Sequence, residues 1–177
     1  MSQDSIAMWS FETPLGWIAL LWCGEKLRQV SFGHRSDREA IAALDPALAA
    51  RAARHNPSPA LVHRLIAYTR GKPESFADVE LDFSGLTVFQ QRVLRCCQQI
   101  PYGHTVSYGQ LAAMAGYPGA ARAVGNCMAA NRFPLVVPCH RVIAADGSVG
   151  KFSAPGGQAA KQLLLAMEAH AGQPQRT

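Results

Sequence analysis

The sequence lacks the features of membrane-spanning, secreted and disulfide-rich proteins. No apolar run approaches the roughly 20 residues that a membrane-spanning helix needs. The first residues, MSQDSIAMWSFE, carry an acid where a secretory signal carries basic residues. The five cysteines have no CxxC spacing, and an odd number of thiols disfavours a disulfide framework. We therefore expect a cytoplasmic protein with free thiols and no membrane contact.

Patterns that bind metals are also scarce. The six histidines show neither i,i+4 pairing nor HxxxC spacing, so we expect no metal site. The sequence has no internal repeat and no low-complexity tract. Its last residues, GQPQRT, are polar and lack any periodic pattern, so we expect residues 171–177 to form a flexible tail.

What is present suits a packed globular protein. Of the 177 residues, 49% are hydrophobic and 16% charged, which is enough apolar material for one ordinary domain or two small ones. The formal net charge of +5 is a moderate surplus that favours a polyanionic partner. Charge alone gives only a weak indication of nucleic-acid binding.

The first half of the chain predicts a small sheet with helices. Residues 9–32 alternate between apolar and polar and contain two turns, TPLG and CGEK, so we expect a three-stranded antiparallel meander. Helices are expected behind the capping residues Ser36 and Ser58. ADVELDF, residues 77–83, alternates again and predicts a further strand. Composition then shifts towards alanine and glycine, which predicts a domain boundary near Gly85, with units at 1–84 and 85–170.

The second half predicts mainly helices. Thr87 caps a helix over about residues 88–99, Ser107 caps SYGQLAAMAG, and ARAVGNCMAAN follows the turn GYPG. The last two helices have the length and turn of a helix-turn-helix, although helical hairpins also occur in cores. The later helix is rich in alanine, so it suits close approach to a DNA backbone better than reading of bases. Arg122 is its one long projecting side chain.

The segment VVPCHRVI, residues 136–143, contains the most reactive-looking residue of the chain. Pro138 can open a short helical turn with Cys139 in its first positions, where backbone amides favour a thiolate. His140 and Arg141 add positive or polarisable neighbours, so we expect the pKa of Cys139 to be lowered and its thiolate to act as a nucleophile. An inert, buried cysteine remains the alternative. Adjacent residues hydrogen-bond poorly to each other, so His140 would act through a water, with Glu168 as a candidate carboxylate behind it.

Three segments in this order resemble one family. They are IPYGHTVSYGQLAAMAG, ARAVGNCMAAN, and VVPCHRVIAADGSVGKFS followed by GG, K, LL and E. Together they are similar to the O6-alkylguanine-DNA alkyltransferases, closely over about residues 85–169 and more loosely over TPLGWIAL and VSFG. The resemblance implies an α+β protein of two domains. These are a small ribonuclease H-like sheet with helices and a mainly helical domain of winged-helix or helix-turn-helix type.

The resemblance also implies an activity and its partners. Family members need no cofactor, bind double-stranded DNA through the minor groove, flip out an alkylated guanine and move the alkyl group to their own cysteine, once per molecule. O4-alkylthymine would be a further substrate. The implied protein is a monomer that works at the nucleoid with no obligate protein partner.

Residue roles follow by position. Cys139 would be the acceptor, His140 the water-mediated base and Glu168 the carboxylate that orients it. Asn131 would tie the cysteine turn to the helix-turn-helix, and Tyr108 would stand beside the base and phosphate during flipping. The residues implied in DNA and substrate binding are Arg122, which would fill the gap in the stack, Arg141, and four that would form the guanine pocket: Val142, Phe152, Ser153 and, on its apolar wall, Met128.

The chain departs from the family pattern at three places. Phe152 stands where many relatives have tyrosine, so no hydroxyl can donate from that ring. FSAPGGQ is two residues longer than the common form, and Leu163 occupies a position often filled by tryptophan. The ligands of the zinc site found in some relatives are not matched apart from Cys23, so no metal is expected.

Three other functions are compatible with parts of this pattern. A lesion-sensing protein of the same shape would bind alkylguanine without accepting the group, but such relatives replace the cysteine. A cysteine hydrolase would turn over repeatedly on an ester or peptide. A DNA-binding regulator would bind in a strongly sequence-dependent way and would be indifferent to Cys139→Ala.

Overall fold

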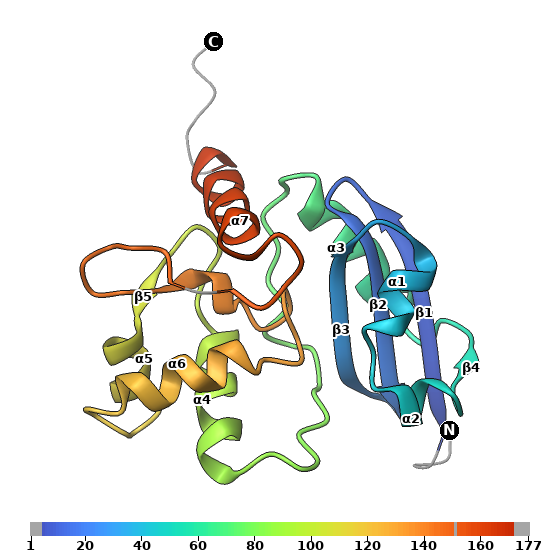
Figure 1. Ribbon diagram of the computed structural model, residues 1–177, viewed down its shortest axis with the longest axis horizontal. Coiled ribbons are helices and arrows are strands. Elements are labelled where there is room, and N and C mark those ends of the chain that lie inside the picture. Colours follow the sequence, from blue (N-terminus) through green and yellow to red (C-terminus); the bar gives the residue numbers. More distant parts are fainter. Residues whose placement is uncertain (1–4, 151, 172–177) are drawn as a thin grey trace.

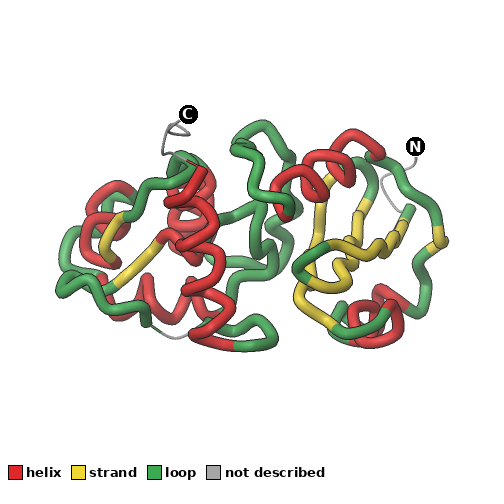
Figure 2. The backbone as a smooth tube through the Cα atoms, turned by 90° about the horizontal axis from the view of Figure 1, so that it is seen from above, coloured by secondary structure: helices red, strands yellow, loops and turns green. Residues whose placement is uncertain are grey.

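The computed structural model describes residues 5–150 and 152–171, and in it a sheet with its helices lies beside a mainly helical half (Figures 1 and 2). The first half contains β1 (Ile6–Thr13), β2 (Gly16–Cys23), β3 (Lys26–His34), α1 (Asp37–Ala42), α2 (Pro46–Ala49), β4 (Ala53–Arg54) and α3 (Pro59–Thr69). The second contains α4 (Val88–Gln98), β5 (Val106–Ser107), α5 (Tyr108–Met114), α6 (Ala121–Ala129), the 3₁₀ turn η1 (Cys139–Arg141), β6 (Val142–Ile143) and α7 (Gly157–Ala171). The mixed α+β class is confirmed.

The predicted meander is confirmed as strands β1 to β3, paired antiparallel in the order β3-β2-β1. The tight β1–β2 turn depends on Gly16, whose φ of 92° is one that side-chain-bearing residues rarely adopt. A Cβ there would lie 2.7 Å from the carbonyl oxygen of His34. A two-residue strand, β4, extends the sheet by pairing parallel to β1, and no periodic pattern in the sequence marks it.

Each face of the sheet has its own helical cover (Figure 1). Ala19 and Leu21 of β2 pack against Ala40 and Leu44, in α1 and just after it. The opposite face belongs to the main core, to which α3 and the helical half also contribute. This core therefore extends across Gly85, and the division of the chain into units at that residue stands as a proposal.

The strand expected at residues 77–83 is wrong. Only Leu81 forms a bridge, parallel to Leu27, through two backbone hydrogen bonds. The side chain of Gln98 occupies the carbonyl oxygens of Phe76 and Val79, and that of Asp82 accepts from the amide of Ser84. Within ADVELDF, Gln98 thus takes the Val79 carbonyl oxygen and only Leu81 pairs with β3, so the alternation marks a segment lying along the core instead of a strand.

The predicted helix starts are confirmed, with one difference. Ser36, Thr87 and Ser107 each accept a hydrogen bond from the third residue of their helix, and the last two form complete capping boxes. Ser58 precedes α3 as expected but makes no side-chain capping bond, and its amide donates to Oδ1 of Asn56. The expected tail, residues 171–177, lies outside the described residues except for Ala171, which ends α7.

Candidate functional site

The segment before Cys139 forms a tight, buried turn. Cys139 opens η1 directly after Pro138, as the sequence predicts, and the Arg141 amide donates to the Pro138 carbonyl oxygen at 2.9 Å. The cysteine is only 3% exposed. Leu135, four residues earlier and also buried, has a φ of 71°, in a region that non-glycine residues seldom occupy. The backbone therefore bends sharply to bring the thiol into the core.

Asn131 fixes this turn to the end of α6. Its Nδ2 donates to the Val137 carbonyl oxygen at 2.9 Å, and its Oδ1 accepts from the Phe133 amide at 2.9 Å. It also hydrogen-bonds to Cys139 and thereby acts to lower the pKa of that thiol. Asn131 thus joins the cysteine turn to the helical hairpin, which is the place that the family resemblance implies for it.

The expectation of a lowered thiol pKa is wrong for the protein in this structure. Burial raises the pKa of Cys139 because a thiolate loses its solvation there, and this outweighs the hydrogen bond from Asn131 and the positive charge of Lys161. Arg141, expected to favour the thiolate, directs its guanidinium to Glu168 and to the carbonyl oxygen of Ile100. The thiol is therefore protonated at neutral pH until a base removes its proton.

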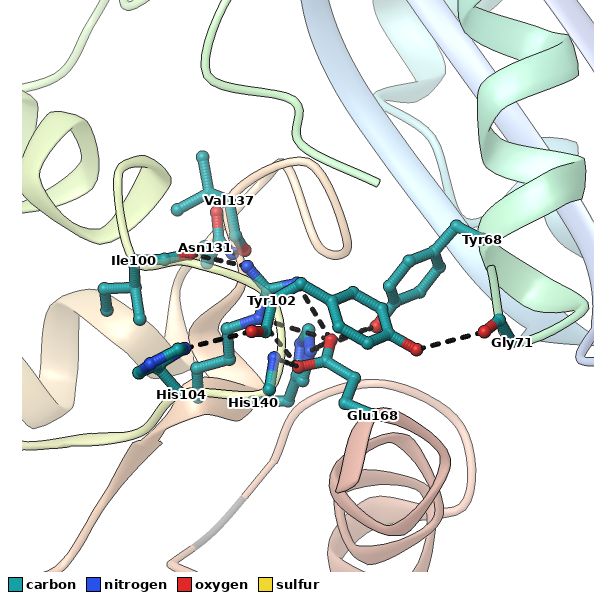
Figure 3. A network of polar contacts seen from close by, with 11 residues as sticks. Tyr68, Gly71, Ile100, Tyr102, His104, Asn131, Val137, His140 and Glu168 are labelled. Carbon is teal, nitrogen blue, oxygen red and sulfur yellow. Dashed lines mark hydrogen bonds and ion pairs between the residues drawn. The ribbon is translucent and has the colours of Figure 1, made fainter. Parts of the chain in front are cut away.

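The expected base and its carboxylate lie together (Figure 3). Nε2 of His140 is 2.8 Å from Oε1 of Glu168, and both side chains are almost completely buried. Arg141 donates to the same carboxylate from Nε at 2.9 Å and from Nη2 at 2.9 Å, and the Gly103 amide donates at 3.0 Å. Although burial raises the pKa of Glu168, the hydrogen bonds from His140 and Arg141 hold it well below its usual range. Glu168 is therefore an anion and can only accept.

This charge state determines which nitrogen of His140 can act as a base. Because Glu168 is an acceptor, the proton of a neutral His140 resides on Nε2, and the lone pair is on Nδ1. Nδ1 is buried, and no described residue hydrogen-bonds to it. Burial lowers the pKa of His140 and Glu168 opposes that shift, so the imidazole is neutral at physiological pH. The site thus holds a buried base beside a buried thiol.

Tyr108 lies near Lys161 and Cys139. It begins α5, and β5 just before it pairs with β6, so that Val106 faces Val142, three residues after the cysteine. Its hydroxyl is 3.5 Å from Nζ of Lys161. A Cβ on Gly125 would lie 3.9 Å from the Tyr108 ring, and one on Gly150 would lie 2.8 Å from its hydroxyl. These two glycines therefore leave the room that the tyrosine occupies.

The other residues implied in substrate binding are divided between core and surface. Met128 and Val142 are buried in the main core. Phe152 is half-buried, with its ring 6.1 Å from that of Phe32, and with exposed Ser153 it lines a pocket of about 420 Å³ between β3, Asn131 and residues 152–155. Arg122 projects from α6 into solvent. The structure thus brings Cys139, His140, Asn131 and Glu168 together and leaves Arg122 outside that cluster.

Two buried polar residues of the site had no role assigned from the sequence: Tyr68, which lies in no motif, and Lys161, the lysine of the family pattern. Lys161 is 1% exposed, and its Nζ donates to the Val142 carbonyl oxygen at 2.6 Å. Its signal is its spacing, because Lys161, Leu164 and Glu168 form the buried face of α7 at i, i+3 and i+7. Tyr68 donates to Glu168 from α3 at 2.7 Å, a contact across 100 positions that no local pattern predicts.

Two expected absences can be compared with the described part of the chain. Residues 5–150 and 152–171 contain no group of three or more histidine, cysteine or acidic side chains that could hold a metal ion. No helix among them is long and apolar enough to cross a bilayer.

Known proteins share both the sequence and the fold. Residues 88–170 match the family described as "6-O-methylguanine DNA methyltransferase, DNA binding domain". The methylated-DNA–protein-cysteine methyltransferase of Mycolicibacterium paratuberculosis is 50% identical over 107 residues, which cover 60% of this chain but only 62% of that protein. The human protein of the same name is 36% identical over 167 residues, covering 91% of this chain and 79% of the human one.

Solved structures match over nearly the whole length. The crystal structure of Mycobacterium tuberculosis OGT in complex with DNA has a TM-score of 0.76 at 35% identity, covering 93% of this chain and 94% of that one. The O6-methylguanine-DNA methyltransferase of Pyrococcus kodakaraensis has a TM-score of 0.66 at 25% identity. With its buried Pro-Cys-His-Arg turn, its relay to Glu168 and these relatives, the chain belongs to the methylated-DNA–protein-cysteine methyltransferase family.

Proposed function

We propose that the chain repairs DNA directly, by moving the alkyl group of O6-alkylguanine, and also of O4-alkylthymine, to its own Cys139. The observation that carries this proposal is the buried thiol beside the His140–Glu168 pair in a member of this family. The two relatives compared with this chain are named as methyltransferases, which favours transfer over the sensing of lesions without chemistry.

The reaction needs no second reactant. His140 takes the thiol proton at Nδ1 through a bridging water, and the imidazolium is stabilised by Glu168. The sulfur then attacks the alkyl carbon, the S–C bond forms as the C–O6 bond breaks, and the bonding pair stays on the guanine. The guanine anion takes up one proton in place of the one that His140 removed from the thiol, and His140 returns its proton through the water, so the products are a thioether and an unmodified base. Water does not hydrolyse a thioether, so each molecule acts once.

The raised thiol pKa is compatible with this chemistry. A protonated, buried Cys139 resists oxidation and unspecific alkylation, and it becomes nucleophilic only when His140 removes its proton. Lys161 favours the thiolate through its charge, and Asn131 does so through its hydrogen bond. Tyr108, whose hydroxyl lies near Lys161, is in our proposal the donor that stabilises charge on the leaving guanine.

DNA would be held through its backbone, mainly from the minor groove. The alanine-rich α6 permits close approach, and exposed Arg122 is the side chain that would fill the gap left by a flipped base. Flipping costs a few kcal/mol, less for a lesion that pairs badly. We propose that Val142, Phe152 and Ser153 contact the base, with Met128 behind them. We further propose that Arg141 contributes to substrate binding indirectly, by fixing Glu168 through its two hydrogen bonds. We also propose that the protein works as a monomer in the cytoplasm, at the nucleoid.

Intact-protein mass spectrometry tests the proposal. Incubation with duplex DNA containing O6-methylguanine should add one methyl mass per molecule, and peptide mapping should place it on Cys139. Cys97 and Cys127 are internal controls, because both are buried thiols with raised pKa values. Unmodified protein after incubation with excess damaged DNA would rule out the proposed activity, as would a methyl group on either control thiol.

A further inference from the structure

Tyr68 brings the N-terminal half of the chain into contact with the relay. It lies in the last turn of α3 and is completely buried. Its hydroxyl donates to Oε1 of Glu168 at 2.7 Å and lies 3.1 Å from Nε2 of His140 (Figure 3). The three polar groups thus form a closed triangle, two of whose corners come from the C-terminal half and one from the N-terminal half.

The tyrosine ring is fixed by aromatic neighbours. It packs edge-on against Tyr102, with ring centroids 5.9 Å apart, and against Phe76 at 6.0 Å. The His140 ring lies 6.4 Å away. Burial and the negative charge of Glu168 raise the pKa of Tyr68 well above its usual value, so the hydroxyl keeps its proton. A rigid ring therefore presents a permanent donor to Glu168.

Hydrogen-bond directions then restrict His140. The single hydroxyl proton of Tyr68 points to Glu168, so its oxygen faces Nε2 as an acceptor. Oε1 of Glu168 is also an acceptor, so both partners of Nε2 require a proton on that nitrogen. The remaining lone pair of the ring is on Nδ1, which has no partner among the described residues.

We propose that Tyr68 is a positioning residue for alkyl transfer: its hydroxyl bridges Glu168 and His140 and holds the imidazole in the tautomer that offers Nδ1 to the thiol. This inference rests on the proposed function, and it makes the N-terminal half part of the reaction centre. By donating to Glu168, the hydroxyl also shares the negative charge that would otherwise raise the pKa of His140 further.

The neighbouring tyrosine provides a matched control. Tyr102 packs against Tyr68 and below the guanidinium of Arg141, but its hydroxyl donates to the backbone oxygen of Gly71 at 3.3 Å. Tyr68→Phe and Tyr102→Phe each delete one hydroxyl from the same aromatic cluster. Only the first deletion removes a hydrogen bond of the relay.

The test measures single-turnover methyl transfer by the full chain from about pH 5 to about pH 9, across the range in which histidine titrates. We expect Tyr68→Phe to slow transfer at neutral pH about 10-fold to 100-fold, the range for a hydrogen bond to a charged group. Lesion affinity, measured in a Cys139→Ala background, should change by less than about twofold because no group that binds DNA is altered. Tyr102→Phe should retain the parent rate within about twofold.

The pH profile distinguishes positioning from a structural role. The charged and titratable groups facing His140 are Glu168 and Lys161 of α7, Arg141 and Cys139 of its own turn, and Tyr68 of α3. Without the Tyr68 hydroxyl, the unshared negative charge of Glu168 stabilises protonated His140 more strongly and raises its pKa. The acidic limb of the rate profile should therefore move to higher pH in Tyr68→Phe and stay in place in Tyr102→Phe.

Each outcome decides one question. Absence of methyl transfer by the parent protein would contradict the proposed function itself. A parent that transfers normally, with Tyr68→Phe matching Tyr102→Phe in rate and pH profile, would refute the role of Tyr68 alone. If Tyr68→Phe folds poorly, the ¹⁵N chemical shifts of His140 in the parent decide instead, because the inference requires a proton on Nε2 and fails if Nδ1 carries it.

Discussion

Glu168→Gln replaces the one anion that five donor groups approach at the centre of the site. The donors are Tyr68, His140, the Nε and Nη2 atoms of Arg141 and the Gly103 amide. Glutamine has nearly the same shape, but it has no charge and turns one acceptor oxygen into a donor. Arg141, only 4% exposed, would be left without its anion.

The size of the effect follows from this burial. Removing one partner of a buried ion pair costs about 3–5 kcal/mol, because the other charge stays buried without compensation. Glutamine keeps one carbonyl acceptor, so we expect the lower end, about 3 kcal/mol of unfolding free energy. For a chain of this size, that corresponds to a fall in melting temperature of about 6–12 °C.

The loss should depend on pH in a defined direction. The pKa of Glu168 is lower in the folded protein than its ordinary value of 4.5. Its contribution to stability is therefore complete above that value and is lost as the pH falls towards the folded-state pKa. Since glutamine does not titrate, the difference in stability between parent and variant should be largest at neutral pH and should shrink below about pH 4.5.

Denaturant unfolding at several pH values measures this difference. Glu25→Gln is the control, because Glu25 is an exposed glutamate in the β2–β3 turn and should behave like the parent. Glu168→Gln should also transfer methyl groups more slowly while still binding lesions, since Glu168 acts behind the base His140. Equal stability of Glu168→Gln and parent at neutral pH, or a difference that does not change with pH, would refute the reasoning.

Two further substitutions probe the site from other sides. Gly150→Ala places a Cβ 2.8 Å from the Tyr108 hydroxyl oxygen, too close for a normal contact, so the tyrosine must shift. Transfer should then slow by up to about 100-fold with little loss of stability. An unchanged rate would argue against a role for that hydroxyl. Asn131→Ala should raise the thiol pKa of Cys139 further and cost about 1–3 kcal/mol, because the Val137 carbonyl oxygen and the Phe133 amide lose their partner. A pH titration of thiol reactivity measures the change in the Cys139 pKa, and an unfolding curve measures the loss of stability. A Cys139 pKa that stays the same or falls in Asn131→Ala would contradict the proposed role of Asn131.

Local signals in the sequence were sufficient for the elements that depend on local chemistry. Ser36, Thr87 and Ser107 cap helices because a hydroxyl three residues before an amide needs no distant partner. The alternation at residues 77–83 was misleading, because a strand also needs backbone groups that are available to a neighbouring strand. Here the side chain of Gln98, from α4, already binds the carbonyl oxygens of Phe76 and Val79.

The candidate site shows the same division. Cys139, His140, Asn131 and Glu168 could be named from motifs, and the structure brings them together. The raised pKa of Cys139 could not be predicted, because burial depends on the whole core and outweighs the neighbours that the sequence displays. Tyr68 could not be named because its contact depends on how α3 packs against the cysteine turn, and Lys161 stood in the family pattern without a role because that role depends on the packing of α7.

Leu135 has a further consequence for how this segment can vary. Its left-handed backbone costs a non-glycine residue about 1–3 kcal/mol, while its side chain is 1% exposed. Glycine would relieve the backbone but leave a cavity costing about 2–5 kcal/mol, and asparagine would suit the backbone but bury an amide without partners. No residue type meets both demands, so each exchange at this position trades one defect for another, four residues from the sulfur.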